Sequence, residues 1–192
     1  MSILEADSDK LLTAVRSLLA AKGIAAPAEI AARIRITDGG SHAQGARMVA
    51  KAWTDPAYRA RMLADGARAA EELDIPMRGL PPLGVLEDTA DVHNLVVCTL
   101  CSCYPRAVLG YPPFWFKSAA YRARAVRDPR AMLVEFGTTI PETVKLRVVD
   151  STADYRWMVL PLRPAGTEGW SAEQLAAIVN EGDMIGVTIP AF

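Results

Sequence analysis

The cysteines constrain this chain most, because all three lie within one hexapeptide, Cys98-Thr99-Leu100-Cys101-Ser102-Cys103. Thiolates are soft ligands for transition metals, and three of them so close in sequence converge readily on one ion. The CxxC spacing lets Cys98 and Cys101 face one point, and Cys103 follows too closely to turn away. The backbone nitrogens of Ser102 and Cys103 lie in the same loop, where a highly charged ion can displace an amide proton. The hexapeptide, which we call the claw, therefore offers three sulfur and two nitrogen ligands around one open coordination position.

Three other readings of the cysteines are weaker. A structural zinc site usually has four protein ligands, and the sequence provides no second Cys or His pair. His93 is the nearest candidate, but it lies in an extended run and is better explained as an ordinary strand residue. A redox CxxC does not account for the third cysteine, and a disulfide framework does not fit an odd, clustered set.

Turn residues at positions 37–41 divide the chain into an N-terminal helical arm, residues 1–40, and a domain of residues 41–192. In the arm, an apolar stripe predicts an amphipathic helix over 7–22, and a second helix over 28–35 follows Pro27. The stripe consists of Leu11, Leu12, Val15, Leu18 and Leu19. It covers either a second chain or the arm's own domain, and the sequence leaves both open.

The domain alternates helical and extended patterns, and the clustering of its strands between helices predicts an α+β fold. Two helices over 45–66 are separated at Thr54-Asp55-Pro56, where capping and a first-position proline restart the helix. Pro112 and Pro113 precede an arginine-rich helix over 114–126, and a capping box at Ser171 starts a closing helix to about residue 180. Strands are predicted over 83–87, 93–98, 146–149, 155–160 and 184–189. The claw follows the second of these strands at its C-terminal end.

Composition excludes several classes of function. The chain has 192 residues, is 51% hydrophobic and carries a formal net charge of −1, so neither a nucleic acid nor an anionic membrane surface is an expected partner. No apolar run approaches the roughly 20 residues that span a bilayer. The acidic start, MSILEADSDK, lacks the apolar core of a signal peptide, which leads us to expect a cytoplasmic protein.

The stretch Val97–Gly110, VCTLCSCYPRAVLG, resembles the metal-binding motif of nitrile hydratase α subunits. The helical block 45–66 and the segment LRPAGTEGW at 162–170 are also similar to that family, so the resemblance spans most of the chain. It implies a layered α-β-β-α domain and a non-corrin Co(III) or non-haem Fe(III) ion. The implied ligands are the sulfurs of Cys98, Cys101 and Cys103 and the backbone nitrogens of Ser102 and Cys103. It also implies oxidation of Cys101 to sulfinic acid and of Cys103 to sulfenic acid.

Two residues of the motif bear on the choice of metal, and four residues of the chain bear on the pocket or an interface. Thr99 and Tyr104 resemble the cobalt branch of the family, whereas the iron enzymes usually carry Ser at the first position. The motif is also similar to the thiocyanate hydrolase γ subunit, which is the second candidate. Thr99, Tyr104, Arg106 and Arg156 are expected at the substrate pocket or at a subunit interface.

The expected activity is hydration of a nitrile to its amide, a hydro-lyase reaction. The sequence offers no Ser-His-Asp set and no Gly-rich phosphate loop, so catalysis is expected at the metal centre, with Cys103, Cys101 and Ser102 around it. The resemblance implies a β-type subunit that completes the active site, with arginines that bind the oxidised sulfurs, and a cobalt chaperone or activator. A metal-loaded accessory subunit without catalysis is a further alternative.

One departure from the family concerns the residue three positions after the claw. Most members have YPWPVLG, whereas this chain has Tyr104-Pro105-Arg106-Ala107-Val108. Arg106 exchanges an aromatic wall for a cation. This predicts a larger or more polar nitrile, such as one on a specialised metabolite, and it equally favours an anion such as thiocyanate.

Overall fold

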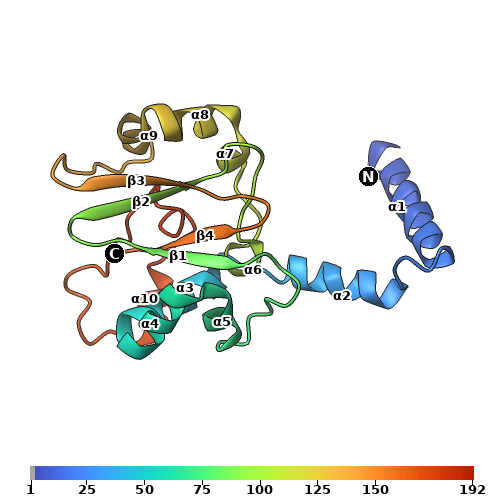
Figure 1. Cartoon of the computed structure of the whole chain (residues 1–192), viewed down its shortest axis with the longest axis horizontal. Coiled ribbons are helices and arrows are strands. Elements are labelled where there is room, and N and C mark those ends of the chain that lie inside the picture. Colours follow the sequence, from blue (N-terminus) through green and yellow to red (C-terminus); the bar gives the residue numbers. More distant parts are fainter. Residues whose placement is uncertain (1–2) are drawn as a thin grey trace. The chain divides into compact units, whose positions relative to one another are not determined.

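The computed structural model describes residues 3–192, with the backbone alone described at 3–6 and 37. The chain forms two compact units, Met1–Gly39 and Gly40–Phe192. The first contains α1 (Ile3–Ala21) and α2 (Pro27–Asp38) (Figure 1). α2 continues past the predicted end at residue 35 into the predicted turn. It starts at Pro27, and the Glu29 carboxylate accepts a hydrogen bond from the Ala26 N–H at 2.7 Å.

Three helices begin the second unit: α3 (His42–Thr54), α4 (Pro56–Ala64) and α5 (Gly66–Glu71). The predicted break is confirmed, because the Asp55 carboxylate accepts from the Tyr58 N–H at 2.9 Å and caps α4. The two helices predicted over 45–66 are α3 and α4, and the helix that follows them was not predicted. Asp65 repeats the same capping by accepting from the Arg68 N–H at 3.0 Å, and this starts a third helix.

The strands form two parallel pairs that lie next to each other (Figure 1). β1 (Leu83–Glu87) pairs with β4 (Arg156–Leu160), and β2 (Val92–Val97) pairs with β3 (Lys145–Asp150). Within this register, Val97 lies opposite Asp150 at the end of β2. The strand positions agree with the predictions to within one or two residues, whereas the pairing depends on contacts distant in sequence.

Helices cover both sides of the strands. α3, α4, α5 and α10 (Ala172–Ala177) lie on the side of β1, and α7 (Phe114–Lys117), α8 (Ala119–Arg127) and α9 (Pro129–Glu135) lie on the side of β2 and β3 (Figure 1). The short helix α6 (Arg106–Leu109) follows the claw. The α+β prediction is therefore confirmed. The single helix predicted over 114–126 was wrong, because Ser118 adopts an extended conformation and caps a new helix through the Tyr121 N–H at 3.1 Å.

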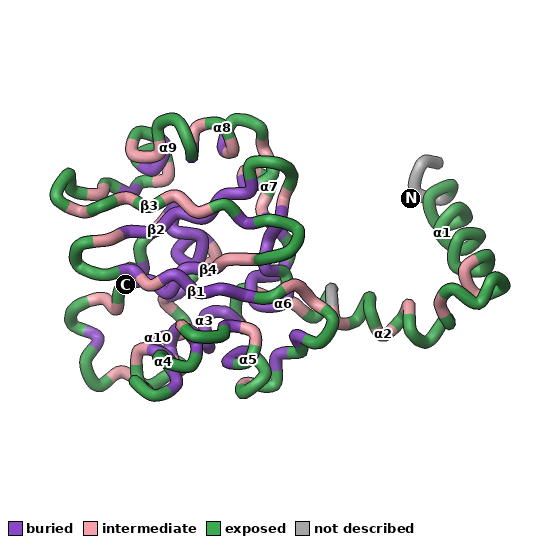
Figure 2. Tube along the Cα trace, in the orientation of Figure 1, coloured by how far each residue is buried: buried purple, intermediate pink, exposed green. Residues whose placement is uncertain are grey.

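The predicted last strand over 184–189 was wrong. Residues 181–188 form successive turns, in which Gly186 has a φ of +85° and the Gly182 carbonyl accepts from the Gly186 N–H at 2.8 Å. Met184, Ile185 and Val187 are buried, so the apolar pattern that predicted a strand belongs to a buried loop. Figure 2 shows that buried residues gather along the strands and on the helices next to them. The closing helix ends at Ala177 rather than at about 180. Among the described residues, no helix is long and apolar enough to cross a membrane.

Candidate metal centre

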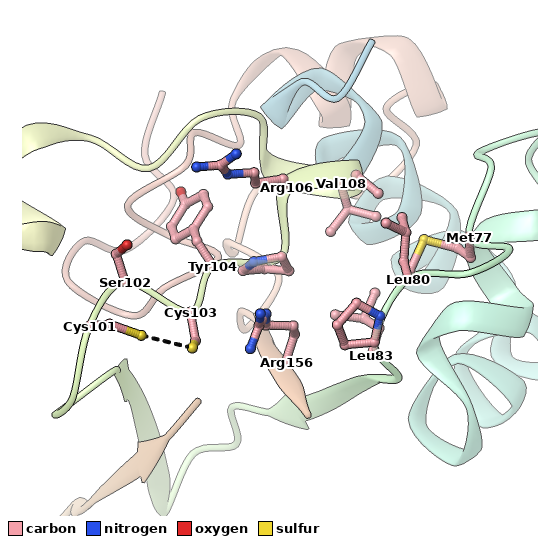
Figure 3. Close-up of a pocket in the computed structure, with 13 residues that line it drawn as sticks. Met77, Leu80, Leu83, Cys101, Ser102, Cys103, Tyr104, Arg106, Val108 and Arg156 are labelled. Atoms are coloured by element: carbon pink, nitrogen blue, oxygen red, sulfur yellow. Dashed lines mark hydrogen bonds between the residues drawn. The ribbon is translucent and has the colours of Figure 1, made fainter. Parts of the chain in front are cut away.

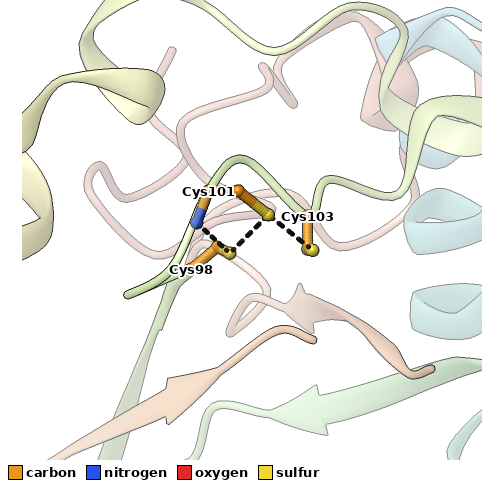
Figure 4. Close-up of side chains that lie close together, drawn as sticks. All are labelled: Cys98, Cys101 and Cys103. Carbon is orange, nitrogen blue, oxygen red and sulfur yellow. Dashed lines mark hydrogen bonds between the residues drawn. The ribbon is translucent and has the colours of Figure 1, made fainter. Parts of the chain in front are cut away.

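The three cysteine sulfurs converge on one point at the end of β2 (Figure 4). The Sγ atoms of Cys98 and Cys101 are 3.7 Å apart, those of Cys101 and Cys103 are 3.2 Å apart, and all three lie within 4.8 Å of one another. Cys98 and Cys103 are buried, whereas Cys101 is exposed. The Cys101 N–H also donates to the Cys98 sulfur at 3.3 Å, which closes the loop tightly. The claw is therefore folded into a ligand set.

Neighbouring elements hold the claw from two sides. From the end of β3, the Asp150 carboxylate accepts from the Thr99 N–H at 3.0 Å and from the Thr99 hydroxyl at 2.5 Å. From α8, the Arg122 guanidinium donates to the Leu100 carbonyl at 2.8 Å. Sequence reasoning assigned Thr99 to the pocket or an interface and missed Asp150. Only the register that places Val97 opposite Asp150 reveals this contact.

The thiols of Cys101 and Cys103 differ in pKa. Hydrogen bonds from Cys103 and from the Ser102 backbone lower the pKa of the Cys101 thiol. Burial, with a contribution from Cys101, raises the pKa of the Cys103 thiol to about 11, and Arg156 opposes this increase. Cys101, the exposed sulfur, is therefore the thiol that loses its proton more readily. Thiolate is the form that binds metal ions and that oxidises.

A cavity of about 310 Å³ opens beside the claw (Figure 3). One wall is apolar and the other carries Cys101, Ser102 and Cys103, with Arg156 between them. The apolar wall consists of Met77, Leu80, Pro81, Leu83, Ala107 and Val108, and Tyr104, Pro105 and Arg106 complete the lining. The structure thus brings Tyr104, Arg106 and Arg156 together around the cavity. A volume near 300 Å³ lies at the small end of the range for ligand sites.

Two polar groups of this lining are buried without a hydrogen-bond partner among the described residues, the Tyr104 hydroxyl and the Arg156 Nη1. Unpaired buried polar groups are rare and costly in folded proteins. Burial also raises the pKa of the Tyr104 phenol, which therefore remains a hydrogen-bond donor. Both groups are available to a molecule in the cavity or to oxygen atoms added to the sulfurs.

Arg106 stands on the rim of the cavity rather than at its centre. It begins α6, its side chain is exposed, and its guanidinium lies 4.9 Å from the centre of the Tyr111 ring. Such a cation–π contact contributes about 0.5–1 kcal/mol at an exposed site. It holds a positive charge beside the entrance.

The residues present fit a thiolate-bound transition metal. Three convergent sulfurs are a soft donor set, and the backbone nitrogens of Ser102 and Cys103 lie within the same loop. His93, the histidine nearest to the claw in sequence, lies in β2 and contacts Asp88 and Gly186 instead. The site is therefore that of a protein whose metal is held by one cysteine-rich loop beside a substrate-sized cavity.

Comparison with known proteins identifies the family. Residues 6–188 match the family described as "Nitrile hydratase, alpha chain", so the chain belongs to the nitrile hydratase α-chain family. It is 53% identical over 146 residues to the low-molecular weight cobalt-containing nitrile hydratase subunit alpha of Rhodococcus rhodochrous, covering 76% of this chain and 70% of the relative. It is 45% identical over 156 residues to the thiocyanate hydrolase subunit gamma of Thiobacillus thioparus, covering 76% and 64%.

A solved structure agrees with this assignment. A double mutant of Fe-type nitrile hydratase from Comamonas testosteroni Ni1 superimposes with a TM-score of 0.82 at 38% sequence identity, covering 96% of this chain and 91% of that one. The family therefore includes cobalt-containing and iron-type proteins. It also includes thiocyanate hydrolase subunits, so membership by itself leaves the metal and the substrate to be argued from the site.

Proposed function

We propose that this chain is the metal-binding α-type subunit of a cobalt nitrile hydratase, which adds water to a nitrile to form an amide. The observation that carries the proposal is the convergence of three sulfurs on one wall of a cavity that also contains two unpaired polar groups. The cobalt-containing relatives and the residues Thr99 and Tyr104 support cobalt over iron.

Cys98, Cys101 and Cys103 would hold the ion through sulfur, and Ser102 and Cys103 through backbone nitrogen. Bound Co(III) would supply a Lewis acid that polarises a nitrile or activates water. Oxygen atoms on oxidised Cys101 and Cys103 would face the cavity, where Arg156 and the Tyr104 hydroxyl can donate hydrogen bonds to them or to the substrate. Such hydrogen bonds would orient the reacting groups.

The lining supports a nitrile with an apolar body and a polar substituent. Met77, Leu80 and Val108 provide the apolar wall, and Arg106 provides a cation at the rim. A cavity of about 310 Å³ has room for a nitrile of the size of a heteroaromatic ring. The cation would contact an acceptor group at the outer end of such a substrate.

We also propose that a β-type subunit completes the site. Leu100, at the outer side of the claw, is 85% exposed, and Phe114 at the start of α7 is 87% exposed. Large apolar side chains this exposed beside a functional site are typical of surfaces that bind another protein. Assembly would also protect the exposed Cys101 from further oxidation. A cobalt chaperone or activator would load the metal.

One experiment tests the activity. The chain is coexpressed with its β-type partner in cobalt medium, and the complex is assayed with a small aliphatic nitrile, a polar heteroaromatic nitrile and thiocyanate. We expect cobalt in the complex and the highest kcat/KM with the heteroaromatic nitrile. Arg106→Trp should reduce this preference by roughly tenfold or more, which corresponds to loss of a contact of about 1.4 kcal/mol. A matched control is Arg127→Trp, at the end of α8.

Thiocyanate hydrolysis is the second candidate, and Arg106 favours it. A cation at the rim attracts an anion, and the thiocyanate hydrolase subunit gamma is a close relative. Thiocyanate turnover exceeding that of every nitrile would replace the first proposal. A complex that contains cobalt and converts neither class would instead indicate an accessory subunit.

A further inference from the structure

A buried polar network lies at the start of β2, at the opposite end of this strand from the claw, and the proposed function does not use it. His93 in β2 and Asp88 in the turn before it are only 5% and 7% exposed. The His93 Nδ1 lies 3.0 Å from the Asp88 Oδ2, and the His93 Nε2 lies 2.9 Å from the Gly186 carbonyl oxygen. Both ring nitrogens thus face oxygen atoms that can only accept. Neutral imidazole has one N–H, so both contacts are satisfied only in the imidazolium form.

The carboxylate that faces His93 is itself held firmly. The second oxygen of Asp88 accepts from the Asn94 backbone N–H at 2.8 Å and from its side-chain amide at 2.7 Å. The remaining oxygen of that amide accepts from Arg147 of β3 at 2.7 Å. Two hydrogen bonds to Asp88 and one between His93 and the Gly186 carbonyl therefore surround the buried charge pair, as such pairs require.

The other charged groups around the network have partners of their own. Glu87, at the end of β1, forms an ion pair with Arg59 of α4. Asp183, in the C-terminal loop, accepts from the Thr188 hydroxyl at 2.6 Å. Burial by itself lowers the pKa of His93, but the hydrogen bond to Asp88, the charge of that carboxylate and the Gly186 carbonyl hold the pKa above its ordinary value.

The C-terminal loop, residues 180–188, connects the two strand pairs. The Ile185 carbonyl accepts from the Val96 N–H of β2 at 2.8 Å, and the Met184 carbonyl accepts from the Val159 N–H of β4 at 2.7 Å. The loop lies directly on β2, because a Cβ added at Gly186 would come within 1.8 Å of the Asn94 carbonyl oxygen.

These bonds connect β2, the strand before the claw, with β4, the strand that contains Arg156. β2 leads directly into Cys98 of the claw, and β4 begins with Arg156 of the cavity. The position of one strand relative to the other therefore sets the position of the claw relative to Arg156.

We propose that His93 is a positioning residue, an imidazolium that fixes the C-terminal loop across the two strand pairs and so positions the claw against Arg156. The role of His93 in fixing the loop is independent of the metal and the substrate, whereas its effect on the claw, read from cobalt release, rests on the proposed function. A histidine with a raised folded pKa stabilises fully below its unfolded pKa of about 6.5, and this stabilisation is lost as the pH rises through the folded value. The connection should therefore weaken at alkaline pH.

The protonation state is tested directly by NMR of the full-length chain, which contains only two histidines, His93 and His42. The His42→Gln variant removes the signal of the exposed histidine and assigns the other. We expect both ring nitrogens of His93 to be protonated in the folded chain at pH 7. A folded chain at pH 6 in which one of these nitrogens lacks its proton would overturn the proposal.

The connection is tested by hydrogen exchange at the amides of Val96 and Val159, with protection normalised for the intrinsic rate at each pH. We expect their protection to fall at least about tenfold as His93 loses its proton. The Ser151 amide, which donates to the Val97 carbonyl at 2.7 Å, is the matched control and should keep its protection. Equal protection across the titration, or an equal loss at Ser151, would contradict the role of the loop.

The Asp88→Asn variant separates charge from packing. Its side-chain amide can donate to a neutral His93 while its oxygen still accepts from Asn94, so every bond is kept without the charge pair. We expect a lower His93 pKa and protection at Val96 that no longer changes above pH 7.

The effect of His93 on the claw is tested with the cobalt-loaded chain, by measuring the rate at which it releases cobalt to a chelator. The ratio of the release rates of wild type and Asp88→Asn should change severalfold between pH 6 and pH 9. A constant ratio would overturn the effect on the claw. If the variant does not fold, the wild-type titration and exchange measurements decide the proposal alone.

Discussion

Asp150 holds the claw through Thr99, and its replacement gives a quantitative test of this contact. Its two oxygens accept from the Thr99 N–H at 3.0 Å and the Thr99 hydroxyl at 2.5 Å. Hydrogen bonds to charged groups contribute about 1.5–3 kcal/mol, but both residues are exposed and solvent screening reduces this to about 1 kcal/mol each. Asp150→Ala should therefore destabilise the closed loop by about 2 kcal/mol, roughly thirtyfold in its closing equilibrium.

The assay is a double-mutant cycle with Asp150→Asn and Thr99→Val, measured as the rate of cobalt release from the loaded chain. Each substitution should accelerate release about fivefold. The double mutant should be less than additive by about 1 kcal/mol, because both variants remove the same bond. Thr99→Ser keeps the hydroxyl and should behave as wild type, and Asp154→Asn removes a charge from the exposed turn after β3 as a control. Effects that add within about 0.3 kcal/mol would refute the contact.

Three further predictions concern the metal and the arm. The active complex should contain cobalt, and full activity with iron alone, measured by metal analysis of cultures grown on either metal, would contradict this. Replacement of Cys98, Cys101 or Cys103 by alanine should abolish metal retention. Ser102→Ala should retain the metal, because the proposed ligand from Ser102 is its backbone nitrogen. A Cys98→Ala variant with normal cobalt content would contradict the claw proposal. The exposed stripe of α1, in which Leu11 is 67% and Leu18 is 55% exposed, is proposed to bind the β-type partner. Deleting residues 1–39 should then leave the melting temperature of the remainder unchanged and weaken assembly at least tenfold, since one buried Leu contributes about 1.5–3 kcal/mol; unchanged affinity would refute it.

Local signals were sufficient for most helices and strands. Ser171 caps its helix as predicted, and of the two predicted caps Thr54 and Asp55 it is Asp55 that caps α4, because capping involves residues three apart in sequence. The same local chemistry explains the helix after Asp65, which was not predicted, and the break at Ser118, where the prediction of one continuous helix was wrong. The prediction of a strand over 184–189 was wrong for a different reason. Periodicity does not distinguish a strand from a buried loop, and the positive φ of Gly186 departs from the extended backbone of a strand.

The sequence by itself determined the chemistry of the claw. Three cysteines within six residues have little freedom to point apart, so covalent connection alone predicted that their sulfurs meet. It also indicated Tyr104 and Arg106, because both follow the claw directly along the chain.

Only the tertiary structure decided what surrounds the claw. Asp150 is 51 residues from Thr99 and Gly186 is 93 residues from His93, so neither contact has a local signal. Both depend on the parallel register of the strands and on a loop that connects two strand pairs. Such contacts form only when distant segments pack together. A single sequence shows the residues but does not show which strands pair and bring them within reach.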